Sequence, residues 1–65
     1  MKKYIIYTTI GGHNYFMCLI NGTPSVKNGP SDDQVMKFED FEAADIIAKR
    51  NSNSGVTYKV KEINF

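Results

Sequence analysis

The 65-residue sequence contains no tryptophan, one cysteine, one histidine and one arginine. With Cys18 alone, no disulfide can form within the chain, whereas secreted domains of this size usually carry several. The longest apolar run, residues 15–20, is far too short to span a membrane. The lysine-rich start becomes polar by residue 8, unlike a secretory signal. These scarcities predict a cytoplasmic protein without a membrane partner.

The length allows a single domain, residues 1–65, with a thin hydrophobic core. A hydrophobic share of 42% with 23% charged residues is typical of a globular chain and excludes a disordered one. The net charge of +1 produces no strong overall field toward nucleic acid or anionic lipid. So small a domain has little stability to spare, and we expect no buried catalytic apparatus.

The first half of the chain has the composition of β-strands. Residues 2–10 are β-branched and aromatic, and residues 15–20 form a second apolar run after a turn signal at residues 11–14. The pair predicts a β-hairpin. Two interpretations stay open for the next segment: Thr23–Lys27 is a short edge strand after an Asn21-Gly22 turn, or residues 21–33 form a long loop.

The second half changes to a helical period. Residues 35–38 are extended in type, and Asp40 then precedes an apolar stripe at helical spacing, made of Phe41, Ala44, Ile47 and Ala48. Residues 56–63 alternate as a last strand, with Val56, Tyr58 and Val60 expected to face the helix. The order predicts an α+β fold: a three- or four-stranded antiparallel sheet with one helix packed on one face.

The residues that carry most enzyme chemistry are scarce. His13 lies in a turn signal and Cys18 in a strand, with no third group to orient them as a nucleophile pair. No spacing of histidines and cysteines suits a metal, and Gly11-Gly12 precedes a strand, unlike a phosphate-binding loop at the start of a helix. We therefore expect no enzyme activity, no cofactor and no metal.

The strand over residues 15–20 is apolar at every position, although one helix can shelter only one face of a sheet. Large side chains left on the other face would form a docking patch for a protein partner or a second copy of the chain. The candidate residues of this patch are Ile5, Tyr7, Tyr15, Phe16 and Met17. The alternative is that residues 21–34 fold back and cover the face.

Charge is unevenly distributed along the chain. Residues 31–45 carry a local net charge of −5, and the rest of the chain carries +6. Such a dipolar molecule can be steered toward a charged partner. The acidic candidates for partner binding are Asp32, Asp33, Glu39, Asp40, Glu42 and Asp45.

Lysines and tyrosines of the terminal strands indicate an alternative, single-stranded nucleic acid, because sheet surfaces can stack bases on aromatic rings beside lysines. The candidates are Lys3, Tyr4, Tyr7, Lys59 and Lys61. The RRM signature motif does not occur, and lysines on edge strands also prevent aggregation. A homodimer with no separable activity is the third possibility.

Residues 38–48, followed by residues 58–63, combine an aromatic strand end, a helix with small residues and a closing strand. This pattern resembles small strand-strand-helix-strand proteins of bacteriophages, such as the RNA-polymerase inhibitors of T7-like phages. The resemblance implies a noncatalytic protein-binding module that inhibits or redirects a host macromolecular machine by covering its surface. A phage-encoded protein of this kind would act in the host cytoplasm. No contact residues are transferred, because the acidic strand of those inhibitors has no close counterpart here.

Overall fold

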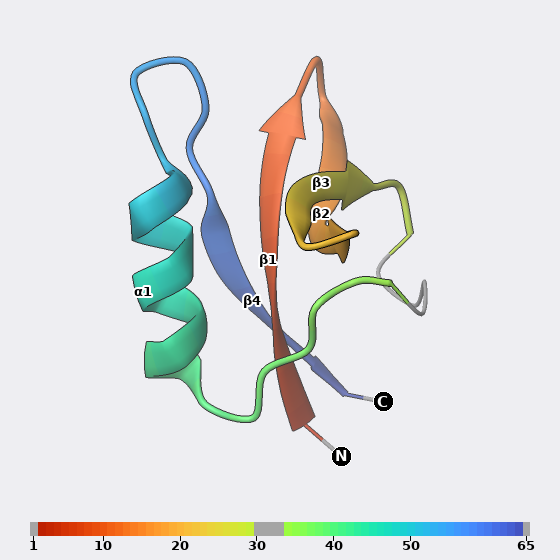
Figure 1. Cartoon of the computed structure of the whole chain (residues 1–65), viewed down its shortest axis with the longest axis vertical. Helices are drawn as coiled ribbons and strands as arrows, with labels where there is room; N and C mark the ends of the chain where they lie inside the picture. Colours follow the sequence, from red (N-terminus) through yellow and green to blue (C-terminus); the bar gives the residue numbers. More distant parts are fainter. Residues whose placement is uncertain (1, 30–33, 65) are drawn as a thin grey trace.

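One antiparallel sheet and one helix make up the computed structural model, which describes residues 2–29 and 34–64 (Figure 1). The elements in chain order are β1 (Lys2–Ile10), β2 (His13–Ile20), β3 (Thr23–Lys27), α1 (Phe41–Asn51) and β4 (Lys59–Asn64). The strands lie side by side in the order β3-β2-β1-β4, so the last strand returns beside the first. The predicted α+β class, with an antiparallel sheet and one helix, is confirmed.

Two tight turns connect the first three strands. The φ angles are 59° and 82° at Gly11-Gly12, and 52° and 77° at Asn21-Gly22. Positive φ at both central residues is the geometry of the two-residue hairpin turn that matches the twist of antiparallel strands. The open question about Thr23–Lys27 is thereby answered in favour of a strand. The first turn uses only the two glycines, so β2 starts at His13, two residues earlier than expected.

Glycine should matter at the second turn for its backbone conformation alone. We expect Gly22→Ala to lower the free energy of unfolding by about 1 kcal/mol, because an L-residue is strained at φ 77° although space for a Cβ is available. Gly29→Ala is the matched control: its Cβ would also meet no atom within 4 Å, and its φ is not positive. Urea denaturation of both variants checks this, and equal stability would contradict it.

Helix α1 packs on β1 and β4 through its small residues. Ala44 and Ala48 are buried against Ile6 and Met17, and the alanines let the helix lie close to the sheet. The predicted stripe is therefore only partly correct, because Phe41 is 47% exposed at the start of the helix. Asp40 occupies the N-cap position as expected, but its side chain makes no capping hydrogen bond.

β1 and β2 separate at one end, and residues 35–38 lie between them. The two strands pair only from Tyr7↔Phe16 to Ile10↔His13. Beyond that point Tyr4 exchanges two backbone hydrogen bonds of 2.8 Å with Phe38, and the Met36 amide donates to the carbonyl of Met17 at 3.1 Å. Figure 1 shows this segment crossing β1 on its way to α1. We call residues 35–38 the wedge.

Side chains of the wedge contribute to both faces of the sheet. Met36 and Phe38 pack against the core under α1, whereas Val35 packs with Ile5 and Phe16 in a second buried cluster on the opposite face. The wedge therefore supplies apolar cover that one helix cannot provide.

The expectation that one side of β2 faces water is wrong for its central residues. Phe16 is 5% exposed, Met17 1% and Cys18 0%, so the strand is buried on both sides there. Internal cover is the outcome. Among the described residues, Val35 provides this cover on the face away from α1. It lies one residue beyond residues 21–34, the segment that was expected to fold back.

Candidate functional site

The predicted sheet patch is divided between the two faces of the sheet. Ile5 and Phe16 lie on the face away from α1 but are buried, and half-buried Tyr7 packs beside them. Met17 and Tyr15 belong to the opposite face. Met17 packs under the helix, and Tyr15, two residues earlier in β2, pairs with Thr8 of β1. The five residues therefore do not form one docking patch.

The acidic candidates lie around the start of α1, where they are described. Glu39, Asp40 and Glu42 are exposed, whereas Asp45 is half-buried and forms an ion pair with Lys49 at 2.9 Å. Asp32 and Asp33 lie outside the described residues. Ion pairs partly neutralise this segment, because Glu39 also has a lysine partner in β1.

Lysines converge on the sheet face away from α1. Paired residues of neighbouring strands point to the same face, and the register Tyr7↔Lys59 and Ile5↔Lys61 puts both β4 lysines beside the β1 residues of that face. Alternation along β1 places Lys3 there as well. At the opposite edge of the sheet, the pairing Phe16↔Lys27 adds a lysine from β3 to the same face.

We call this surface the lysine face. It consists of Lys3, Lys27, Lys59 and Lys61 around Tyr7 and Phe16. No aspartate or glutamate stands at the described strand positions that point the same way. The acidic residues that the structure describes are instead gathered near α1 and at Glu62, whose β4 position points to the helix side. Among the strand residues that the structure describes, the fold thus places lysines without aspartate or glutamate on this face.

A single row across all four strands runs through the middle of the lysine face. In strand order it reads Lys27, Phe16, Tyr7 and Lys59. The Tyr7 and Phe16 rings have centroids 6.4 Å apart and are tilted by 42°. Three strand spacings put the backbones of the outer residues ~14 Å apart. In this row the aromatic pair thus has one lysine residue on each side.

One lysine of the face is engaged within the molecule. The Lys3 ammonium donates a hydrogen bond of 2.7 Å to Glu39 Oε1. This hydrogen bond, with the charge attraction that accompanies it, holds the pKa of the Glu39 carboxyl below its usual value. Glu39 is therefore a charged competitor for Lys3, whereas no ion pair is formed by Lys27, Lys59 or Lys61 among the described residues.

Tyr4, the remaining nucleic-acid candidate, is on the wrong face. Its ring packs against the core under α1 and meets Phe41 edge-on at 5.8 Å between centroids. Its even position in β1 turns it away from Lys3 and Tyr7. Lys27 was not among the sequence candidates. Lys27 could have been found from two features of the sequence. The Asn21-Gly22 turn sets the register between β2 and β3, and alternation along β3 then places Lys27 on the face of Phe16.

The residues considered for catalysis do not come together. His13 and Cys18 are five positions apart on one strand, so their side chains point to opposite faces, and Cys18 is fully buried. Among residues 2–29 and 34–64, no three histidine, cysteine, aspartate or glutamate side chains form a group that could hold a metal. In the same residues no helix is long and apolar enough to cross a membrane.

No family model, curated protein or solved structure matches this chain, so the resemblance to phage host-modulating proteins stays a hypothesis and the site is argued from its own geometry.

Proposed function

We propose that this protein is a small noncatalytic binding module that holds single-stranded nucleic acid on the lysine face. The observation that carries the proposal is the gathering of four lysines around Tyr7, with no acidic residue among the described strand positions of that face. Ammonium groups bind the phosphates of a nucleic-acid backbone without regard to sequence.

The aromatic row provides a place for a base. Tyr7 is only half-buried, and Phe16 supports its ring from the neighbouring strand. A base stacked on an aromatic side chain contributes about 1–3 kcal/mol, with little dependence on its identity. One half-buried ring flanked by lysines favours weak binding of a short single strand with little sequence preference.

A protein partner remains the competing proposal, as an inhibitor or modulator of a host machine. Its physical premise was an open apolar face, and the burial of residues 16–18 removes much of that surface. The large hydrophobic residues that are exposed in the described chain lie at separate places, namely Ile10, Ile20, Phe41 and Ile46. Charge separation is the stronger feature, and it favours a polyanionic ligand.

The experiment is fluorescence anisotropy with a labelled 12-residue thymidine oligonucleotide. If four lysines each release a counterion, affinity should fall about 50-fold between 50 and 200 mM salt. The Lys59→Gln/Lys61→Gln variant should bind more weakly and show a log–log salt slope smaller by about 1.4. Its matched control is Lys2→Gln/Lys49→Gln, which loses the same charge away from the lysine face.

Three outcomes would overturn the proposal. The first is undetectable binding at 50 mM salt, and the second is equal weakening by the two double variants. The third is equal affinity for polyglutamate, which would indicate that the face recognises an acidic protein instead of nucleic acid.

A further inference from the structure

The hydrogen-bond ladder between β1 and β4 ends before β1 does. Its last pair is Tyr7↔Lys59, although β1 continues to Ile10. Continuing the register would pair Thr9 with Thr57, but β4 starts only at Lys59. The prediction that the last strand begins at residue 56 is therefore wrong by three residues. Beside the end of β1, the place of the missing strand residues is left as a gap.

Thr9 directs its backbone groups into this gap. Tyr4 exchanges its hydrogen bonds with Phe38 in the wedge, on the β2 side of β1. Backbone groups alternate in direction along a strand, so odd residues of β1 turn theirs toward β4. Tyr7 therefore bonds to Lys59, whereas the amide of Thr9 faces a position that the ladder leaves empty.

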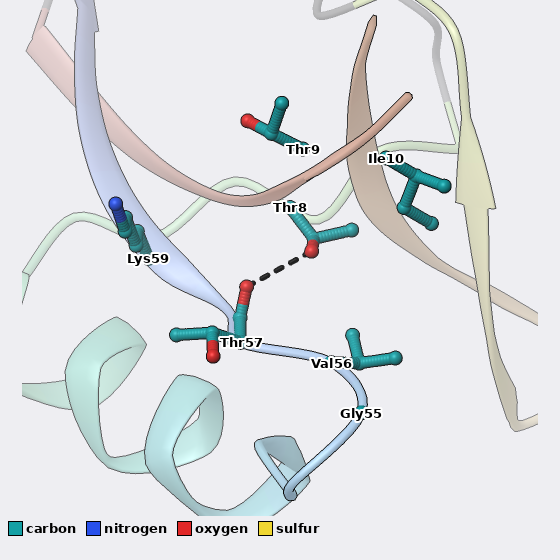
Figure 2. A pocket seen from close by; sticks show the side chains of 7 residues that line it. All are labelled: Thr8, Thr9, Ile10, Gly55, Val56, Thr57 and Lys59. Atoms are coloured by element: carbon teal, nitrogen blue, oxygen red, sulfur yellow. Dashed lines mark hydrogen bonds between the residues drawn. The ribbon is translucent and has the colours of Figure 1, made fainter. Parts of the chain in front are cut away.

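The natural acceptor for the Thr9 amide is engaged elsewhere. The Thr8 hydroxyl donates a hydrogen bond to the carbonyl of Thr57 (Figure 2). The bond is 2.9 Å long, and Thr8 is only 3% exposed. This partly buried bond holds the Thr57 carbonyl toward the helix side of β1. The chain thus satisfies a buried hydroxyl and leaves a backbone donor open to a ligand.

A partly open pocket of about 260 Å³ lies at the gap. Its lining residues are Thr8, Thr9, Ile10, Gly55, Val56, Thr57 and Lys59. In Figure 2, Thr8 and Thr9 leave β1 on opposite sides, and the Lys59 side chain extends toward the side of Thr9. A positive charge and an N–H donor without a ladder partner therefore border the same small space, and none of the described residues that line it is acidic.

We propose that this cavity is a phosphate subsite, in which the Thr9 amide and the Lys59 ammonium bind one phosphate group. Charged acceptors form stronger hydrogen bonds with backbone amides than neutral ones do. The volume lies just below the ~300–1,000 Å³ of sites for drug-sized ligands, so it suits a phosphate better than an entire nucleotide. The idea that this subsite holds one phosphate of a bound nucleic-acid strand rests on the proposed function. The binding of free phosphate can be measured separately.

The test is a titration of the ¹⁵N-labelled protein with sodium phosphate, with sodium chloride at equal ionic strength as the reference. The Thr9 amide should show a saturable shift with phosphate that chloride does not produce. Two variants at the same position separate the backbone from the side chain. Thr9→Pro removes the N–H at a point where β4 offers no ladder partner, and Thr9→Val removes only the hydroxyl.

Binding in the variants is followed through the amides of Gly55 and Val56. Thr9→Pro and Lys59→Gln should each weaken phosphate binding ~10-fold or more, whereas Thr9→Val should change it by less than about twofold. An unmoved Thr9 amide in the unaltered protein at about 50 mM phosphate would overturn the subsite, even if Thr9→Pro fails to fold. Equal losses in the proline and valine variants would also overturn it.

The oligonucleotide separates this inference from the proposed function. Phosphate binding without oligonucleotide binding would keep the subsite and reject nucleic acid as the ligand, leaving free phosphate or a phosphorylated small molecule. Oligonucleotide binding that leaves the Thr9 amide unmoved and tolerates Thr9→Pro would keep the function and reject the subsite.

Discussion

Ile6→Ala is expected to lower the free energy of unfolding by about 2–5 kcal/mol. The Ile6 side chain is fully buried and packs with Met17, Ala44 and Ala48 at the contact between α1 and the sheet. The small alanines of α1 cannot fill the cavity that the substitution leaves. A domain of 65 residues has a total stability of roughly 3–10 kcal/mol, so much of it should be lost.

Urea denaturation followed by circular dichroism measures this loss. Ile46→Ala is the matched control, because Ile46 is 53% exposed on α1 and alanine favours the helix. The control should stay within about 0.5 kcal/mol of the unaltered protein. A loss below 1 kcal/mol for Ile6→Ala would mean that the helix does not rest on this part of the sheet.

Ile6 belongs to the part of the fold that local patterns could predict. The even positions of β1 form its more apolar face, and Ala44 and Ala48 stand at helical spacing. The sequence pattern is therefore enough to identify the apolar face of the strand and that of the helix, which pack together. The Asn21-Gly22 turn likewise made the strand Thr23–Lys27 one of the two interpretations, although it did not exclude a loop. Such features depend on residues close together in the sequence.

The division of β2 between two faces was beyond local reasoning. Every residue from Tyr15 to Ile20 is apolar, so alternation gives no sign of which side meets the helix. The wedge answers the question through pairings between distant residues, Phe38 with Tyr4 and Val35 with Cys18. Sequence pattern identified residues 35–38 as extended but contained no signal for their partner.

The candidate site was predictable to a similar extent. Alternation along the last strand predicted that Lys59 and Lys61 lie on the side away from the helix, and the register places them beside Tyr7 and Ile5. Lys27 required the complete strand order. The cavity at Thr9 depends on one hydroxyl that redirects a carbonyl, and no periodicity reveals such a bond.

Val35→Asp should be at least as damaging as Ile6→Ala, through the opposite face of the sheet. Val35 is 3% exposed and packs on Ile5 and Phe16, so an aspartate there would place an unpaired carboxylate in an apolar cluster. We expect a loss of about 3–5 kcal/mol in the free energy of unfolding. Increased fluorescence of a dye that binds apolar surface should accompany it, because the cluster loses its cover.

Thr23→Asp is the matched control, since it introduces the same charge at an exposed position of the edge strand β3. Val35→Ala should fall between the two, because it removes contacts without burying a charge. If Val35→Asp were as stable as Thr23→Asp and bound no more dye, Val35 would not cover Ile5 and Phe16. The face away from α1 would then be open to a protein partner. The docking hypothesis requires such an open apolar face, and the burial of residues 16–18 argues against it.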